Sequence, residues 1–479
     1  MEGIEINSDE LAFHSLSFND RSGRLFEWQE EIYRAIHPQQ APFYHKLLQQ
    51  GVIKELVSKN LLVETELTPL KVDNYELVFK HRRIEFIAYP KEWCGKMLQD
   101  AALLHLDFCL ELERYGLITS DANPLNILFD RCRPIFIDLG SIEQICEDKH
   151  RPWFAHSQFY RCFINPLRLI ARGQGRIARW LIQDYEQGIL PEDVTALTDK
   201  SPLNLWQRNS RYWLKSAIKN HSPKAILPRA KQVRDLARSL FSATDKPLSR
   251  QKFLEQLRQE VVNIDLATSV NLTDSNTTEA TVFSANNLHQ AKLQAVDSIL
   301  SKLQPNSVLE FGNNNSNGDY AQLAANKGSQ VVFLTPEESK AEQLYLHGKQ
   351  NQLAILPLLM NFISPSCDLS NAWFAPASDR LGCDLAIALD LIDWLVFEQR
   401  QCFPFDRIVE RISIFSNRWL LTEFVSITPS DRELLSPHME WIFSWYNLYN
   451  FIDALRQEFR QIDILDHVSE TSVLLLCQK

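Results

Sequence analysis

The sequence predicts an α/β protein whose C-terminal half folds as a doubly wound, mostly parallel sheet. Three observations support this. The 479 residues are many for one hydrophobic core and indicate two domains. After residue 288, short apolar segments alternate with amphipathic helical ones. The first of these apolar segments begins the stretch VLEFGNNNSNG at 308–318 and ends in an acid. A glycine-containing loop follows and leads into a helical segment.

The composition is that of an ordinary soluble globular protein, with 45% hydrophobic and 23% charged residues. A net charge of −10 argues against a nucleic-acid coat or a basic membrane-surface protein. The nine cysteines include no CxxC pair, which is typical of reduced thiols in the cytosol. The start, MEGIEINSDE, has no apolar signal region, and no apolar run is long enough to span a membrane. We therefore expect a cytoplasmic protein without membrane insertion, while the sequence does not indicate its oligomeric state.

The first elements of the N-terminal half form an α+β pattern. Strand-like segments are predicted at 24–36, 61–67 and 75–88, and a helical stretch at 42–58. Residues 96–115 form an amphipathic helix, and its apolar face carries Met97, Ala101, Leu104, Phe108 and Leu112.

A constellation of acids and an amide follows this helix. Asp121 is followed five residues later by Asn126, and Asp138 begins an Asp-Leu-Gly turn after a pair of strand-like runs. Phosphotransferases use such an Asp to orient a hydroxyl, and the Asn and second Asp to hold metal. Residues 20–240 thus resemble the protein-kinase and aminoglycoside-phosphotransferase superfamily. The resemblance implies a catalytic Asp121, metal-binding Asn126 and Asp138, and ATP with Mg²⁺ if the domain is active.

The same region departs from the kinase pattern at three places. No GxGxxG loop precedes the motif, and only Ser22-Gly23 stands in a suitable position. Arg34 is the nearest candidate for the usual strand lysine, and it could face Glu55. Thr119-Ser120 stands before Asp121, where kinases have a histidine two residues upstream. The alternative is a remnant fold in which the acid and amide side chains cap turns.

The middle of the chain is predicted to be helical at 153–187 and 203–241. Basic and aromatic residues mix from 206 to 238, a pattern that can bind phosphates or single-stranded nucleic acid. The acidic whole favours a solvated helical face, so no nucleic-acid partner is expected. The Ser-, Thr- and Asn-rich stretch after residue 266 predicts a linker. We expect domains at 1–265 and 288–479, with the linker at 266–287.

In the C-terminal half a helix at 289–303 precedes the first strand. The further strands are predicted at 308–310, 330–334, 353–359, 383–389 and 419–425, and an antiparallel closing pair at 461–465 and 472–477. Ligands in such sheets bind at the carboxyl ends of the strands, where the strand order reverses.

The loop after the first strand has the pattern of a Rossmann-type binding loop. Gly312 would let a ligand approach the backbone, and Glu310 could accept hydrogen bonds from hydroxyls or amines. Alternatively, Glu310 caps the following helix.

Beyond this loop, the segments PLLMN at 357–361, IALDLIDWL at 387–395 and EFV at 423–425 resemble class I S-adenosylmethionine-dependent methyltransferases of the bacterial nodulation-protein type. N-terminal segments, including PIFIDLGS, share the resemblance, so it covers most of the chain. It implies S-adenosylmethionine as cofactor. The positions that it implies for cofactor binding are Glu310, Gly312, Asn314 and Gly318 in the loop, Thr335 and Glu337 near the ribose, and Asn361 near the adenine.

Three carboxylates are predicted to line the substrate mouth: Asp390, Asp393 and Glu423. One of them would be the general base, and the sequence does not rank them. Asp393-Trp394 stand where the resemblance predicts two histidines. We expect methyl transfer to a small-molecule or saccharide-type acceptor. The alternatives are ATP-dependent phosphoryl transfer by the N-terminal half and a non-catalytic scaffold of two degenerate domains.

Overall fold

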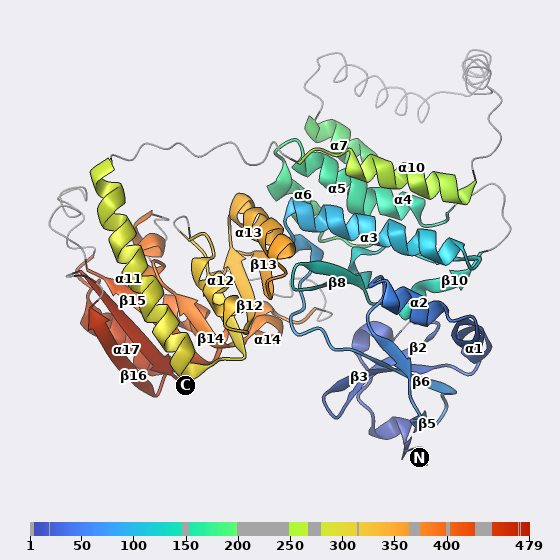
Figure 1. The fold of residues 1–479 in the computed structure, drawn as a ribbon, viewed down its shortest axis with the longest axis horizontal. Helices are drawn as coiled ribbons and strands as arrows, with labels where there is room; N and C mark the ends of the chain where they lie inside the picture. The colour runs from blue at the N-terminus through green and yellow to red at the C-terminus, as the bar shows by residue number, and fades with distance from the viewer. Residues whose placement is uncertain are drawn as a thin grey trace, which may run out of the picture.

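The computed structural model presents two halves side by side (Figure 1). It describes residues 4–18, 20–145, 153–198, 249–266, 279–313, 316–363, 374–398, 403–426, 443–467, 469 and 471–479. The helix predicted at 203–241, with its basic and aromatic residues, lies outside the described residues.

The C-terminal half is built on a seven-stranded sheet in the order β13-β12-β11-β14-β15-β17-β16. The strands are β11 (Ser307–Phe311), β12 (Gln330–Thr335), β13 (Ile355–Leu359), β14 (Cys383–Ala388), β15 (Ser416–Val425), β16 (Gln461–His467) and β17 (Ser472–Gln478). The first five are parallel, and β17 runs antiparallel to both β15 and β16. The strand order reverses between β11 and β14, which confirms the predicted doubly wound sheet and its antiparallel closing pair.

Helices cover both faces of this sheet: α11 (Glu279–Leu303), α12 (Asp319–Asn326), α13 (Glu338–Asn351), α14 (Ala377–Leu381), α15 (Phe405–Ser413) and α17 (Leu448–Glu458). Alternate residues of one strand serve the two faces: Val308 packs in the cluster with α11 and α12, and Leu309 in the cluster with α15 and α17. Because both faces are buried, the parallel strands are mostly apolar, and Glu310 and Glu423 are buried acids within them. Helix α11 begins at Glu279, ten residues before the predicted start and inside the predicted linker.

The N-terminal half begins with a four-stranded antiparallel sheet in the order β2-β3-β6-β4. The strands are β2 (Gly23–Trp28), β3 (Glu31–Ile36), β6 (Leu77–His81) and β4 (Thr65–Leu67), and two short strands, β1 (Glu5–Ile6) and β5 (Lys71–Val72), pair beside it. The predicted segment 24–36 is a hairpin, and its turn residues Gln29 and Glu30 both have positive φ, as twisted two-residue hairpins require. The helical stretch divides at Gly51 into α1 (Ala41–Gln49) and α2 (Val52–Ser58).

Helix α3 (Gly95–Glu113) confirms the amphipathic helix predicted at 96–115, and most of its apolar residues are buried in the core of this half. Short strands and a 3-10 turn follow it: β7 (Leu117–Thr119), η4 (Pro124–Asn126), β8 (Ile127–Asp130), β9 (Arg133–Phe136) and β10 (Ile142–Gln144). The remaining described helices are α4 (His156–Phe159), α5 (Asn165–Ile170), α6 (Gly175–Leu181), α7 (Pro191–Thr198) and α10 (Arg250–Val262). Helix α10 lies along α3, where Arg258 pairs with Asp107.

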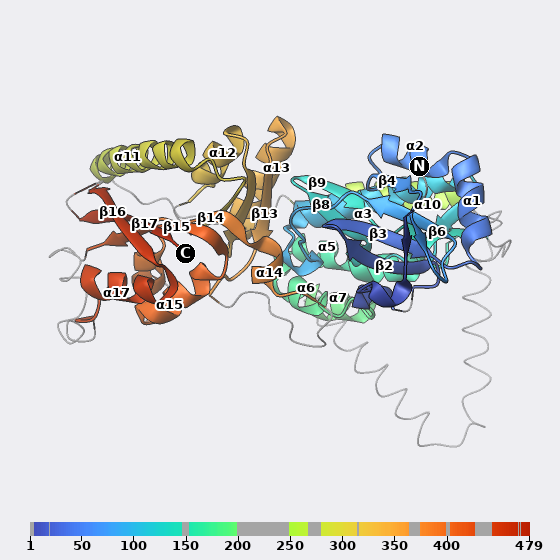
Figure 2. The ribbon, with the colours of Figure 1, turned by 90° about the horizontal axis from the view of Figure 1, so that it is seen from below.

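The two halves share one hydrophobic core and several polar contacts (Figures 1 and 2). Arg380 of α14 forms a buried ion pair with Glu92 and lies over the ring of Tyr89, 4.1 Å from its centroid. On the edge of the sheet, the Cys132 thiol donates to the carbonyl oxygen of Ile355 in β13, at 3.1 Å. The halves therefore form a packed interface of apolar and ionic contacts.

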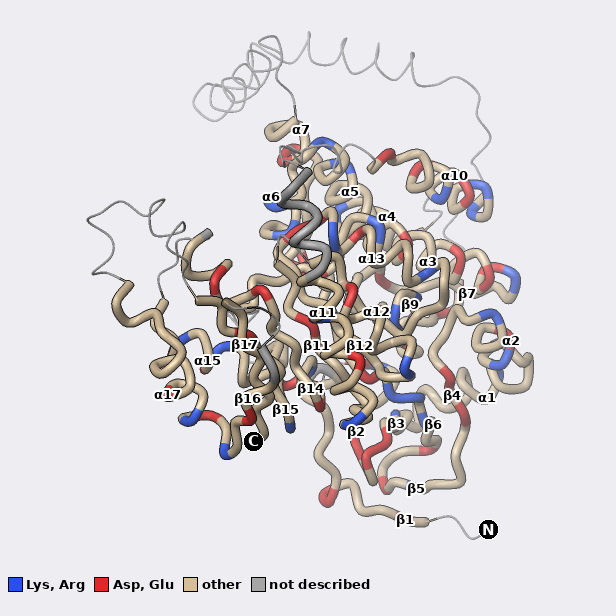
Figure 3. Tube along the Cα trace, turned by 60° about the vertical axis from the view of Figure 1, so that its left-hand side comes forward, with Lys and Arg blue, Asp and Glu red and all other residues tan. Residues whose placement is uncertain are grey.

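Acidic and basic residues are intermixed along both halves (Figure 3). The six cysteines in the described part of the chain are all buried free thiols. Within that same part, every helix is too short or too polar to cross a bilayer.

Candidate functional site

Glu310, at the end of β11, fastens the loop that follows it. Its side chain is buried, and one carboxylate oxygen accepts from the backbone N–H of Ala321 in α12, at 2.6 Å. The other oxygen accepts from the Ser316 hydroxyl. Burial raises the pKa of Glu310 to about 7. The carboxylate thus holds the loop to the first turn of α12, which is the capping arrangement that the sequence left open.

Two glycines allow the loop to lie close against its neighbours. A Cβ on Gly312 would lie 2.4 Å from Phe333 of β12. Gly318 begins α12 in a left-handed conformation, with φ of 75°, and a Cβ there would lie 2.6 Å from Leu344. Only glycine fits both places without a shift. Asn314, predicted to contribute to the same loop, lies outside the described residues.

Sequence reasoning missed two residues that anchor this loop. Asn313 is fully buried, and its amide donates to the backbone carbonyl of Asp390. The Lys340 ammonium, from α13, donates to the carbonyls of Asn313 and Ser316 at 3.0 and 2.8 Å. The loop is therefore tied to the end of β14 and to α13, and a lysine in the first turns of a helix gives no sequence signal of such a role.

The other predicted cofactor residues do lie at the carboxyl ends of β12 and β13. Thr335 is buried, and its hydroxyl accepts from the backbone N–H of Glu337 at 3.2 Å. Glu337 is half-buried at the start of α13. Asn361 is exposed, and its side-chain oxygen accepts from the N–H of Ile363. These positions flank the loop, and their part in binding a cofactor stays a prediction.

The structure brings the predicted carboxylates together around a lysine. Asp390 follows β14 with a positive φ of 53°, and its N–H donates to Glu423 at 3.0 Å. The Lys292 ammonium, from α11, pairs with Asp390 and lies 2.7 Å from the Glu423 carboxylate. Glu423 also accepts from the hydroxyl of Ser472. Burial works to lower the pKa of Lys292, but Glu423 and Asp390 raise it above its ordinary value.

Lys292 was not predicted from the sequence, although the pattern contains a signal for it. It is only 2% exposed, and it lies on the same face of α11 as the buried Val296 and Ile299. A lysine that continues an apolar stripe must either extend to solvent or meet an acid. Here it meets two.

Asp393 is the third carboxylate of the group. Burial, with the charges of Asp390 and Glu423, raises the pKa of Asp393 to about 6, while Lys292 acts in the opposite direction. Asp393 is the carboxylate of the group that has no ion-pair partner among the described residues.

Two buried donors near the carboxylates lack hydrogen-bond partners among the described residues: the Tyr320 hydroxyl and the Trp394 indole N–H. Tyr320 is 4% exposed and interacts electrostatically with Asp390, Glu310 and Glu423. The ring of Trp394 lies beside Phe362, with centroids 6.4 Å apart. Buried donors normally have acceptors, so the unpaired ones indicate a polar ligand at this edge.

The N-terminal constellation is also assembled, but with different partners. The Asn126 amide donates to Asp121 at 2.8 Å, and burial with the nearby Asp138 raises the pKa of Asp121 to about 7. Asp138 pairs with Arg34 at 3.2 Å, and Arg34 also pairs with Asp20. The expectation that Arg34 faces Glu55 is wrong.

Arg34 turns inward because its strand, β3, lies over the Asp-Leu-Gly turn. A Cβ on Gly140 of that turn would lie 2.8 Å from the Arg34 guanidinium. Glu55 instead pairs with Lys59. Among the described residues no group of three His, Cys, Asp or Glu side chains is arranged to hold a metal ion. The metal roles of Asn126 and Asp138 stay predictions.

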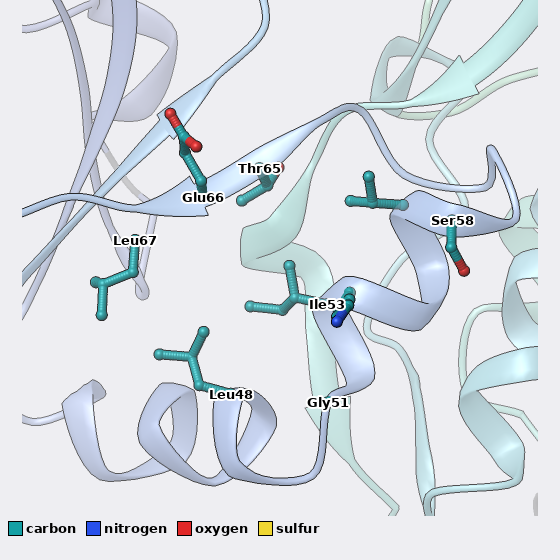
Figure 4. Close-up of a pocket in the computed structure, with 9 residues that line it drawn as sticks. Leu48, Gly51, Ile53, Ser58, Thr65, Glu66 and Leu67 are labelled. Atoms are coloured by element: carbon teal, nitrogen blue, oxygen red, sulfur yellow. The ribbon is translucent and has the colours of Figure 1, made fainter.

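Two surface hollows lie in the N-terminal half. One, of about 350 Å³, lies between strand β4 and the helices α1 and α2, with Leu48, Ile53 and Leu67 on its wall (Figure 4). Another, on Thr65 and Glu66 of the same strand, is lined by charged residues including Lys80 and Arg82. Both belong to the N-terminal half, and neither contains a predicted site residue.

The strand order, with one antiparallel strand inserted beside β15 and a glycine loop braced by an acid after β11, is similar to that of the class I S-adenosylmethionine-dependent methyltransferase fold. No family model matches the chain. Over 465 residues it is 25% identical to the nodulation protein NoeA of Rhizobium meliloti (strain 1021), across 93% of this chain and 92% of NoeA. The similarity to NoeA therefore runs through both halves.

Solved methyltransferases are also similar to part of the chain. Magnesium protoporphyrin IX methyltransferase (ChlM) from Synechocystis PCC 6803, with bound SAH, is 10% identical, with a TM-score of 0.30, and the match covers 51% of this chain and 99% of ChlM. The N-methyltransferase NodS from Bradyrhizobium japonicum WM9 is 10% identical, with a TM-score of 0.28, covering 42% of this chain and 99% of NodS. At such TM-scores nothing about the activity of this chain follows from the likeness.

Proposed function

We propose that the chain transfers a methyl group from S-adenosylmethionine to a small-molecule or saccharide-type acceptor at the carboxyl ends of β11, β14 and β15. One observation carries the proposal. The glycine loop is tied through Asn313 directly to Asp390, so the loop for a cofactor and the carboxylates for an acceptor adjoin at the reversal of strand order. The saccharide-type acceptor rests on the resemblance to the nodulation-protein group, and NoeA bears that name.

The residues that would hold the cofactor are those of the loop, with Thr335, Glu337 and Asn361 beside it. When bound, S-adenosylmethionine would supply an activated methyl group. The chain's own contribution is then to position the acceptor, exclude water and remove a proton. Gly312 and Gly318 allow the loop to pack closely against its neighbours. Glu310 and Lys340 fix the conformation of the loop through their hydrogen bonds.

Asp393 is the proposed general base among the three carboxylates. Asp390 and Glu423 are both engaged by Lys292, whereas Asp393 forms no ion pair within the described part of the chain. With a pKa of about 6, Asp393 is ionised at neutral pH and basic enough to accept a proton. Asp390 and Glu423 then act as positioning groups, and Lys292 holds the two in place.

Titration calorimetry of the full chain with S-adenosylmethionine and its demethylated product tests this proposal. We expect both to bind, and Gly318→Val to abolish binding because its side chain would press on Leu344 and the loop. Gly328→Val is the matched control, because Gly328 also has positive φ but has no atom near its Cβ position and lies in an exposed turn. Failure of the wild-type chain to bind either compound at millimolar concentration would rule out a catalytic role.

For the N-terminal half, we propose a supporting role without phosphoryl transfer. The observation that favours this is the ion pair of Asp138 with Arg34. The buried Arg34 guanidinium balances the negative charge of Asp138, which a magnesium ion would otherwise balance. The kinase resemblance is then one of fold alone, and ATP is not required.

A further inference from the structure

The carboxylate group at the end of the sheet carries more negative than positive charge. Asp390, Asp393 and Glu423 face one cation, Lys292, among the described residues. Uncompensated charge in a buried site is costly, and proteins normally balance it with a partner. Lys292 balances one carboxylate, so the group as it stands has room for a second cation.

The open side of the group is at Asp390. The Asp390 side chain is 35% exposed, whereas those of Lys292 and Glu423 are 2% and 1% exposed. A ligand that arrives from solvent would therefore meet Asp390, with Asp393 three residues further along the chain, before it meets Glu423. Lys292 and Glu423 form the closed floor of the site.

A second feature independently points to a ligand here. The Tyr320 hydroxyl is buried and has no hydrogen-bond partner among the described residues, although it interacts electrostatically with Asp390 and Glu423. A buried phenol normally donates to an acceptor, so a polar atom of a ligand can fill that role for Tyr320.

We infer that the methyl acceptor is an amine whose ammonium form binds between Asp390 and Asp393, with a hydroxyl or ether oxygen of the same molecule accepting from Tyr320. This inference rests on the proposed function. The ammonium supplies the second cation that the group lacks. A hydroxyl in its place would bring no charge, so the site discriminates between an amine and the matching alcohol.

The amine must lose a proton before its nitrogen can accept a methyl group. When the ammonium is bound beside Asp393, one of its N–H bonds breaks and the proton passes to a carboxylate oxygen of Asp393. The electron pair of that bond stays on nitrogen. The products are a neutral amine and a neutral carboxylic acid, so charge and atoms balance. Lys292 holds Glu423 in place through their ion pair, and it is a positioning residue in this step.

Matched ligands test the inference without knowledge of the natural acceptor. Glucosamine and glucose differ only in an amine against a hydroxyl, and so do ethanolamine and ethylene glycol. Binding of all four to the full chain is measured at pH 7 by ligand-observed NMR titration, with and without the demethylated cofactor. We expect the amine of at least one pair to bind about tenfold tighter or better, a modest figure for a partly exposed charge pair. Asp393→Asn should remove that advantage, and Asp406→Asn, at an exposed site in α15, should keep it.

Each result has a distinct reading. Equal binding of amine and alcohol, or no detectable binding of any of the four, overturns the inference. If the demethylated cofactor binds and the amines show no preference, the proposed methyl transfer stands and the acceptor is not an amine. If the amines are preferred and the cofactor fails to bind, the amine site stands without the methyltransferase activity. Because the decisive comparison uses the wild-type chain, a variant that fails to fold does not prevent a result.

Discussion

Replacing Arg380 by methionine should strongly destabilise the chain. The Arg380 guanidinium donates to both oxygens of Glu92, and its Nε donates to the carbonyl of Ala375 at 2.9 Å. The side chains of Arg380 and Glu92 are 2% and 1% exposed. Without the arginine, the Glu92 carboxylate stays buried and accepts from the backbone N–H of Tyr89, at 2.9 Å, with no cation among the described residues to balance its charge. Breaking such a pair costs about 3–5 kcal/mol, which corresponds to a drop in melting temperature of roughly 6–20 °C for a domain of this size.

The assay is thermal unfolding of the full chain, followed by circular dichroism and calorimetry. Arg407→Met is the matched control, because its pair with Glu410 has side-chain exposures of 64% and 43% and should contribute less than about 1 kcal/mol. The double variant Arg380→Met/Glu92→Gln should recover part of the loss, since it removes the stranded charge. If Arg380→Met melts at the same temperature as Arg407→Met, the reasoning about this buried pair is wrong.

Burial raises the pKa of Glu310 from 4.5 to about 7, so the contribution of Glu310 to stability is lost as pH rises through that window. Between pH 4 and 8, the free energy of unfolding of Glu310→Gln should therefore increase by roughly 3 kcal/mol relative to that of the wild type in urea titrations. A difference that stays constant with pH would contradict this. Gly318→Ala should lose about 1–2 kcal/mol more than Gly328→Ala in the same titrations, because only the former meets a neighbour. Methyl transfer should rise as pH increases through about 6, where Asp393 becomes ionised, and Asp393→Asn should flatten that rise in a pH–rate profile; an unchanged profile would exclude Asp393 as the base. Magnesium and ATP at millimolar concentration should move the melting temperature by less than about 1 °C, and a larger shift that Asp138→Ala abolishes would restore the kinase alternative.

The grouping of the candidate site residues could be predicted from the sequence only where the positions of strand ends determine it. Glu310, Asp390 and Glu423 each stand at or just after an apolar run, and parallel strands bring such ends to one edge of a sheet. Their ordering as base or positioning group could not be predicted, because it depends on which of them meets Lys292. That lysine comes from a helix outside the sheet, and the local sequence pattern does not predict over which strands a helix packs.

In the N-terminal half the elements were predicted better than their partners. The strand character of 24–36 follows from alternation, although the alternation did not predict that the segment is a hairpin. The partner of Arg34 depends on a turn more than a hundred residues away. The start of α11 was placed too late because the Ser-, Thr- and Asn-rich segment lacks helical periodicity. The intrinsic helix propensity of these residues is a weak guide to structure. The last residues of the segment belong to α11, the helix that carries Lys292.

Strand β13 ends the sheet on the side of the N-terminal half, where the thiol of Cys132 donates to the Ile355 carbonyl. A bare edge strand offers unpaired backbone groups to any other strand and promotes aggregation. In this chain the cover for that edge lies earlier in the sequence, so the ribosome makes the cover before the strand that needs it. A C-terminal fragment released by a protease would expose β13 and should self-associate. The order of the two halves along the chain is thus a safeguard during synthesis as well as a feature of the finished protein.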